Sequence, residues 1–289
     1  MKHLNYSVSD FIGLECFDPS SEDKGVQNYL ENHGFIPNTV ILGAFWYEEL
    51  ERFSNIDSEV VAIVLPDVFR TESVYWTRND IFLLIEQLHK YSIEVYLKIS
   101  TYPYQLSSLG EMQSFEAGED RRRWLERHQS LLQTKKDGSA TGLRAVNLLK
   151  RTDDGNYYED EFAAQLLNVL EGYGFDGYCA SDGSLGLRGP VDTLENTDFS
   201  DDMLEQFENF SDLKVSGETM SEKAEQVLSE YRGEWTSFWR WRWHQHMLKV
   251  TKVLGEKNKD IIAVDAWSRN PVDMLHDFGV DYEQLQIPG

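Results

Sequence analysis

The sequence predicts an α/β protein, a (β/α)8 TIM-type barrel, and three observations support this fold class. Short apolar runs alternate with amphipathic helical patterns, which is typical of parallel βα units. Two distant segments, beginning at Tyr173 and Phe278, share one pattern: an aromatic residue, Gly, an apolar residue, Asp and then a strand. The chain has 289 residues, enough for one large domain with a sizeable core. We therefore expect a single barrel domain over residues 1–289.

Seven apolar runs are the predicted strands of this barrel. They cover residues 11–16, 40–45, 60–65, 94–99, 175–181, 261–265 and 280–286. The run over 60–65, Val-Val-Ala-Ile-Val-Leu, is apolar throughout, as expected of a strand buried on both faces. A closed barrel of this type has eight strands. The count leaves two interpretations open: one strand lies in a segment without a clear pattern, or the last βα unit is missing.

Helical periodicity predicts most of the connections between these strands. Residues 80–91 carry Ile81, Leu84, Ile85 and Leu88 at i, i+3, i+4 and i+7, which places them on one buried helix face. Further helices are expected over residues 159–170, 221–254 and 272–277.

The long predicted helix over 221–254 carries a conspicuous stripe of large side chains. Trp235, Trp239 and Trp243 recur every four residues. Such a stripe predicts a helix packed on the barrel wall rather than a platform for sugars.

Two segments, residues 101–145 and 184–221, are polar and lack a regular pattern. Connections of this length in a compact domain are usually functional or disordered. We expect both to be excursions over the rim of the barrel.

Composition narrows the range of partners. The net charge of −23 argues against nucleic acid and against an anionic membrane surface, because binding phosphates needs a positive surface. The N-terminal residues lack the apolar stretch of a signal peptide, and no run of eighteen apolar residues occurs. We expect a soluble, cytoplasmic protein, although a secreted chain whose leader had been removed would look the same. The oligomeric state is left open.

The two cysteines, Cys16 and Cys179, both lie in apolar runs that resemble strands. Reduced, buried thiols are therefore expected, and neither a disulfide framework nor a cysteine metal cluster is implied.

Candidate catalytic residues follow from the barrel fold, in which reactive side chains come from the carboxyl ends of the strands. Carboxylates and aromatic rings dominate the predicted strand ends. Glycosidic bond cleavage needs two carboxyl groups, one to protonate the leaving oxygen and one to attack or to activate water. Asp182 and Asp265, at the fifth and sixth predicted strand ends, are the preferred pair. Glu15 in the first predicted strand is a third candidate.

Aromatic and basic side chains at other strand ends are the candidate substrate-binding residues. They are Trp46, Tyr47, Lys98, Tyr102, Trp267 and Arg269. Flat rings can pack against the C–H faces of a pyranose, and only two members of this set are basic. The set therefore favours a carbohydrate over a phosphate ligand.

The segment Gly-Tyr-Gly-Phe-Asp-Gly-Tyr-Cys-Ala-Ser-Asp-Gly, residues 172–183, resembles the fourth-strand region of TIM-barrel glycoside hydrolases. In those enzymes Gly-Phe-Asp-Gly opens the strand and an acidic residue closes it. The resemblance implies that Asp176 is structural and that Asp182 is the carboxylate at the working end. It also implies an enzyme that hydrolyses an oligosaccharide or glycan without a metal or other cofactor. The Asn-Glu acid/base pair that some of these families carry at this strand is absent here.

Other interpretations stay open beside this one. Ser-Asp-Gly is ordinary turn chemistry, so Asp182 could be structural, and the chain could be a non-catalytic carbohydrate-binding or truncated barrel. His244 and His246 form a His-x-His pattern that binds metal in some barrel hydrolases. Residues two apart on a helix point away from each other, however, so no metal site is expected at these histidines.

Overall fold

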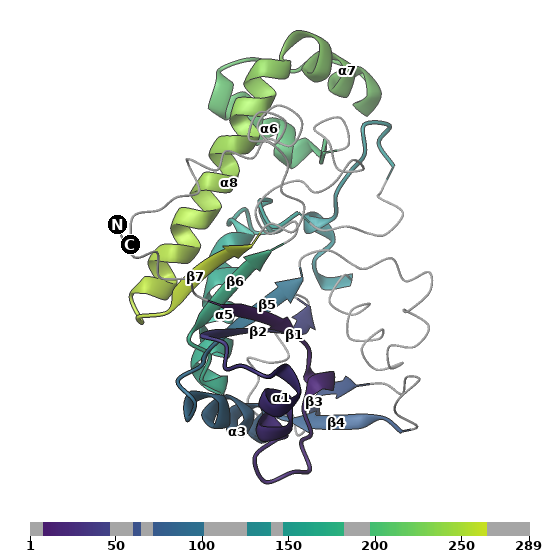
Figure 1. The fold of residues 1–289 in the computed structure, drawn as a ribbon. Helices are drawn as coiled ribbons and strands as arrows, with labels where there is room; N and C mark the ends of the chain where they lie inside the picture. The colour runs from purple at the N-terminus through teal and green to yellow at the C-terminus, as the bar shows by residue number, and fades with distance from the viewer. Residues whose placement is uncertain are drawn as a thin grey trace, which may run out of the picture.

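The computed structural model describes residues 8–46, 60–64, 72–100, 126–139, 147–181 and 197–264. Its centre is a five-stranded sheet (Figure 1). In spatial order the strands are β1 (Ser9–Ile12), β2 (Thr39–Trp46), β5 (Glu94–Ser100), β6 (Gly177–Ser181) and β7 (Asp260–Val264). All four pairings are parallel. The predicted α/β class is thus confirmed, but the strands in the described part of the chain form an open sheet and not a closed barrel.

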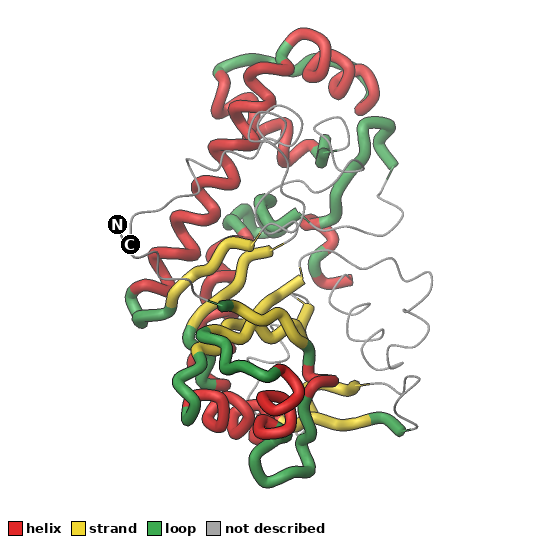
Figure 2. Tube along the Cα trace, viewed as in Figure 1, coloured by secondary structure: helices red, strands yellow, loops and turns green. Residues whose placement is uncertain are grey.

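Helices cover one face of this sheet. They are α1 (Val26–His33), α3 (Arg78–His89), α5 (Tyr158–Tyr173) and the C-terminal half of α8 (Arg232–Gly255). Alternate strand residues such as Val40, Leu42, Val95 and Leu97 point at the helices and are fully buried. Figure 2 shows the strands as one layer with helices alongside. This face is the main hydrophobic core.

Local sequence signals set the ends of these helices. Thr77 opens α3 with a capping box, in which its hydroxyl accepts from the Asp80 backbone N–H and the Asp80 carboxylate accepts from the Thr77 N–H. Gly174 ends α5 in the left-handed conformation, with φ of 84°. The four residues predicted to form the buried face of the helix over 80–91 are all buried. Both predicted helices are confirmed within a few residues.

A second layer of helices lies beyond the carboxyl ends of the strands. It contains α6 (Asp201–Ser211), α7 (Met220–Glu230) and the N-terminal half of α8, at the top of Figure 1. Trp235, Trp239 and Trp243 are buried there, which confirms a core stripe, but they pack with α6 and α7 and not on the wall formed by the strands, as was predicted. The helix predicted over 221–254 is two helices with a break at Tyr231, and α6 occupies a stretch that was predicted to be irregular.

The predicted strand over 60–65 does not join the parallel sheet. It forms β3 (Val60–Val64), which pairs antiparallel with β4 (Val74–Thr77), a strand that the sequence pattern did not reveal. A parallel neighbour needs a crossover of roughly a dozen or more residues, and the chain between β3 and β4 is shorter than that. A short connection therefore returns the chain as an antiparallel pair.

The first strand is shorter than predicted. β1 ends at Ile12, and Leu14–Cys16 form a 3-10 turn, η1, after Gly13. Glu15 and Cys16 are exposed as a result, so the expectation of a buried Cys16 is wrong, whereas Cys179 is buried in β6 as predicted. The predicted elements over 272–277 and 280–286 lie outside the described residues. None of the described helices is both long and apolar enough to cross a membrane.

Candidate active site

The five parallel strands end at one edge of the sheet, and this edge is the candidate active site. Parallel strands point the same way, so their carboxyl ends lie side by side. Trp46 of β2 pairs in register with Ser100 of β5, and Ser181 of β6 pairs with Val264 of β7. These paired strand ends therefore lie at the same level along the edge of the sheet.

Below this edge, the face of the sheet that points away from the helices is packed. Ile41, Tyr96 and Cys179 are buried there against Ile262. A Cβ atom on Gly177 would overlap the Asp260 carbonyl oxygen and stand 2.6 Å from the Tyr96 ring, so this strand position accepts only glycine. Burial, together with nearby carboxylates, raises the pKa of the Tyr96 phenol. Tyr96 thus stays neutral and belongs to an apolar floor beneath the strand ends.

Lys98 stands one layer above this floor, nearer to the strand ends. Its Nζ lies 4.3 Å from the ring centroid of Phe11, on β1. Gly43 of β2 lies between the two, and a Cβ atom there would touch both side chains at 3.8 Å. The missing side chain at Gly43 lets the lysine stem cross β2. The Phe11 ring is 46% exposed, so a cation and an aromatic surface stand together at this edge.

Glu15 does not occupy the position predicted for it. It lies in the 3-10 turn after β1 and is exposed, whereas the sequence pattern predicted a strand residue facing the barrel interior. Its carboxylate folds back over Gly13, because a Cβ atom added there would overlap the Glu15 Oε2. The turn still keeps Glu15 at the carboxyl end of β1, beside the candidate site.

Most of the other predicted site residues lie outside the described part of the chain. These are Tyr47, Tyr102, Asp182, Asp265, Trp267 and Arg269, and of Trp46 only the backbone is described. Asp182 directly follows Ser181, and Asp265 directly follows Val264. The roles given to these residues stay predictions.

A buried group of charges, which sequence reasoning missed, joins the two helix layers. Glu159 at the start of α5 accepts a hydrogen bond from Arg242 of α8 at 2.8 Å. His246 Nδ1 lies 3.7 Å from the same carboxylate, and Lys249 Nζ lies 3.4 Å from its other oxygen. Arg242 also donates to Gln206 and to the Leu149 carbonyl. The sequence signal that could have revealed this charge cluster is the spacing of Arg242, His246 and Lys249 at i, i+4 and i+7, which places them on one face of a helix.

The charge state of Glu159 is fixed by these neighbours. Burial alone would raise the pKa of its carboxyl group, but His246 and Arg242 outweigh burial and lower the pKa to about 2. Glu159 is therefore ionised at neutral pH and cannot act as a proton donor. Its role is structural, although among the described carboxylates its pKa is the one most clearly perturbed by burial and charge together.

A second buried carboxylate ties together connections at the carboxyl edge of the sheet. Asp198 accepts hydrogen bonds from the backbone N–H groups of Thr134 and Ser200, both at 2.9 Å. The Asn147 amide donates to its other oxygen at 3.0 Å, and Lys150 Nζ lies 3.8 Å away. These residues belong to connections that follow β5 and β6. Asp198 thus anchors the rim around the candidate site.

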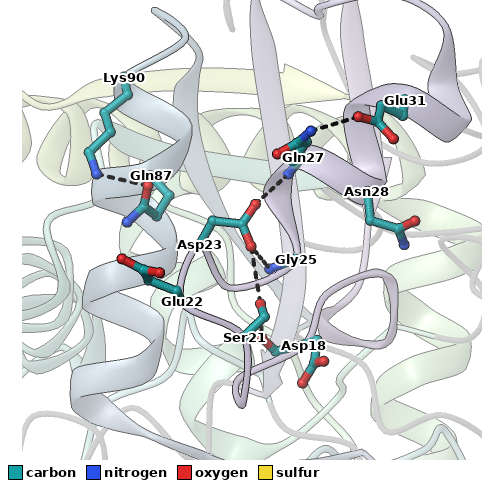
Figure 3. Close-up of a pocket in the computed structure, with 10 residues that line it drawn as sticks. All are labelled: Asp18, Ser21, Glu22, Asp23, Gly25, Gln27, Asn28, Glu31, Gln87 and Lys90. Atoms are coloured by element: carbon teal, nitrogen blue, oxygen red, sulfur yellow. Dashed lines mark hydrogen bonds between the residues drawn. The ribbon is translucent and has the colours of Figure 1, made fainter.

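An acidic groove between α1 and α3 is a poor candidate for chemistry (Figure 3). Its central carboxylate, Asp23, accepts hydrogen bonds from the backbone N–H groups of Gly25 and Gln27 and from the Ser21 hydroxyl. These bonds lower the pKa of Asp23 and cap the start of α1. The groove is therefore explained by helix capping. Within the described ranges, no three His, Cys, Asp or Glu side chains are grouped so that they could hold a metal ion.

Comparisons with known proteins show which solved structure has a fold similar to that of this chain. No protein-family model matches the chain, and no curated protein matches it. Among solved structures, the chain is similar to the beta-galactosidase from the psychrophilic Marinomonas ef1, with a TM-score of 0.52 and 14% sequence identity. The likeness covers 93% of this chain and 41% of the beta-galactosidase chain, so this chain spans less than half of that protein's length. At this identity the likeness is one of fold, an α/β arrangement around a parallel sheet.

Proposed function

We propose that the protein is a glycoside hydrolase-like enzyme that cleaves glycosidic bonds in an oligosaccharide or glycan, with Asp182 and Asp265 as its paired carboxylates. The observation that carries this proposal is the register between β6 and β7. Their last residues, Ser181 and Val264, are paired, and the next residue on each strand is an aspartate.

This register fits the geometry that the reaction needs. Neighbouring strands lie about 4.8 Å apart. Carboxyl groups that leave two adjacent strands at one level fall within reach of the separations of about 5 to 9.5 Å used by glycosidases. Asp182 acts as the nucleophile or base, and Asp265 as the acid. A separation near 5 Å corresponds to retention of configuration, and a larger one leaves room for water and gives inversion.

We also propose that the sheet continues into a (β/α)8 barrel. Helices cover one face, and the other face is buried at Ile41, Tyr96 and Cys179. Burial of both faces and layers of inward side chains are what a parallel barrel requires.

Residues around the strand ends would hold the sugar. Lys98 is a hydrogen-bond donor for ring hydroxyls, and the exposed Phe11 ring beside it offers an apolar surface. Trp46, Tyr47, Tyr102, Trp267 and Arg269 are proposed as further lining residues, and Glu15 as an additional carboxylate at the end of β1.

The test is hydrolysis of a panel of aryl glycosides, beginning with the aryl β-galactoside. We expect turnover by the wild-type chain and a loss of roughly a thousandfold or more in kcat for Asp182→Asn and Asp265→Asn, because each removes a group that acts only in the transition state. Asp153→Asn, an exposed turn position, is the matched control and should keep full activity. Saturable sugar binding that Asp182→Asn leaves unchanged, without any turnover by the wild type, would identify a non-catalytic binding protein instead.

A further inference from the structure

We propose that a groove on the outer face of α8 is a second carbohydrate-binding site, specific for neutral oligosaccharides and separate from the strand ends. The groove has a volume of about 560 Å³ and lies between α8 and the start of α5. It is formed entirely by described residues. The proposal does not require the chain to hydrolyse glycans.

One wall of the groove is a stripe on α8 that points away from the core. Trp241, Gln245, Leu248 and Lys252 recur at i, i+4, i+7 and i+11, so they share one helix face. The Trp241 and Leu248 side chains are 38% and 37% exposed. The Trp241 ring stacks on Phe210 with centroids 5.1 Å apart, which holds the orientation of its plane.

The opposite wall carries a second aromatic ring that is also held in place. Tyr157 is half-buried at the start of α5, and the Arg242 guanidinium lies 4.7 Å from its ring centroid. Lys249 Nζ lies 5.9 Å from the same centroid. Two aromatic rings that line one groove and are each held by neighbouring side chains suit a ligand with flat apolar faces, such as a pyranose, because little conformational freedom is lost on binding.

The charges lining the groove balance and so favour a neutral ligand. Three carboxylates, from Glu159, Asp160 and Glu256, face three basic groups, from Arg242, Lys249 and Lys252. Lys249 pairs with Asp160 at 2.7 Å, and Arg242 pairs with Glu159. Phosphate or another anion would find no excess positive charge here. This balance contrasts with the net charge of −23 for the whole chain.

The ion pairs that line the groove also favour a sugar over a protein as its ligand. A protein anchor residue needs an apolar pocket, and covering these ion pairs with an apolar side chain would desolvate them at a cost. Sugar hydroxyls can instead hydrogen-bond to the exposed edges of the charged groups. Within the part of the chain that the structure describes, the Gln245 amide makes no hydrogen bond, so its donors and acceptor are available to a ligand.

Native affinity electrophoresis in gels that contain galactan, xyloglucan, mixed-linkage β-glucan or starch tests this site. We expect at least one of these neutral polysaccharides to retard the wild-type chain. Trp241→Ala and Tyr157→Ala should each weaken that binding about tenfold, the effect of losing one aromatic contact of roughly 1.4 kcal/mol. Tyr91→Ala removes an aromatic ring of similar exposure, 41%, elsewhere on the surface and should change nothing.

Further variants separate this proposal from the catalytic one. Asp182→Asn should keep the retardation, because only residues of α8 and of the start of α5 line the groove, and a chain without hydrolytic activity should keep it as well. Gln245→Leu, which conserves the size of an exposed side chain, supplies a groove variant that folds even if Trp241→Ala does not. Thermal unfolding checks the fold of each variant.

Three results would overturn the proposal. One is the absence of retardation by all four polysaccharides. Another is retardation that Trp241→Ala, Tyr157→Ala and Gln245→Leu all preserve while Asp182→Asn abolishes it. The third is a concentration-dependent dimer, seen by light scattering and abolished by Trp241→Ala, in a chain that no polysaccharide retards, since this would make the groove a contact between copies of the chain.

Discussion

The core beneath the sheet and the core of the second helix layer are built in different ways. The first is large and mainly aliphatic, and packs β-strand residues against α1, α3, α5 and the end of α8. The second is small and dominated by rings, among them Phe207, Trp235, Phe238 and Trp239. α8 serves both, because its buried stripe changes from tryptophans to Met247, Val250 and Leu254 along its length. Stability in the helix layer is thus concentrated in a few side chains.

The buried charge cluster lies where these two cores meet. Glu159 belongs to a helix that packs on the sheet, and Arg242 lies on α8 between its tryptophan and aliphatic stretches. Arg242 also donates to Gln206 of α6, so one guanidinium connects three helices. We infer that these hydrogen bonds set the position of the helix layer above the sheet.

Replacing Arg242 should have the largest effect, because it breaks the connection between the two cores. Arg242→Met leaves the Glu159 carboxylate buried without its main partner, and we expect a loss of about 4 kcal/mol in the free energy of unfolding, measured in urea. The double variant Glu159→Leu/Arg242→Met should recover more than half of this loss. A single-variant cost below about 1 kcal/mol would show that the ion pair does not link the layers.

Truncating one large side chain in each core compares them directly. Trp235→Ala removes a ring that stacks on Phe199 at 5.5 Å and meets Phe207 edge-on at 5.2 Å. Leu166→Ala removes one of many aliphatic side chains beneath the sheet. Each should cost about 3 kcal/mol, but only the first should also abolish most of the near-ultraviolet circular dichroism of the helix layer. Equal loss of that signal in both variants would mean that the two cores unfold as one.

Lowering the pH should weaken the contact between the two cores, because Glu159 becomes protonated. Its pKa is about 2 in the folded chain, below the ordinary value of 4.5, so the unfolded chain binds the extra proton. The contribution of ionised Glu159 to the free energy of unfolding is therefore complete above about pH 4.5. It is lost as the pH falls towards 2, and the total loss is about 3 kcal/mol. Glu159→Gln should flatten this part of the stability profile. Identical slopes for both chains would contradict the assigned role.

The helix caps should give the smallest effects, and the structure offers a matched pair. Thr77 caps α3 beneath the sheet, and Thr219 caps α7 in the helix layer, each in a capping box. Thr77→Ala should cost about 1.5 kcal/mol and the more exposed Thr219→Ala about 0.5 kcal/mol, as measured by urea unfolding. The reverse order would mean that the helix layer depends more on local helix stability than on its aromatic core.

Periodicity was sufficient to predict the elements that cover or form the sheet. α3 and α5 have apolar stripes, α3 begins at a capping box and α5 ends at Gly174, and β5, β6 and β7 are short runs rich in apolar residues. It could not distinguish a parallel from an antiparallel strand, so β3 was assigned to the wrong sheet. The α6 helix was missed because Ser200, Asp201 and Asp202 at its start are indistinguishable from loop residues without the tertiary contacts of Phe207.

The candidate site residues were predicted as the residues at the carboxyl ends of the predicted strands. An error in the position of a strand end is therefore also an error in the position of a site residue. Glu15 was placed on a strand because Phe-Ile-Gly-Leu reads as one apolar run, whereas the chain turns at Gly13. Lys98 was predicted correctly as a residue near the strand ends, but its contact with Phe11 depends on the parallel order of β1, β2 and β5. The buried network of Glu159 depends on contacts between residues more than eighty positions apart.

The distance between the carboxyl groups of Asp182 and Asp265 in a crystal structure tests the central claim most directly. The paired ends of β6 and β7 predict a separation of about 5 to 9.5 Å, with both groups at the carboxyl edge of the sheet. A separation beyond about 10 Å would contradict the proposal that these two aspartates act together on a glycosidic bond.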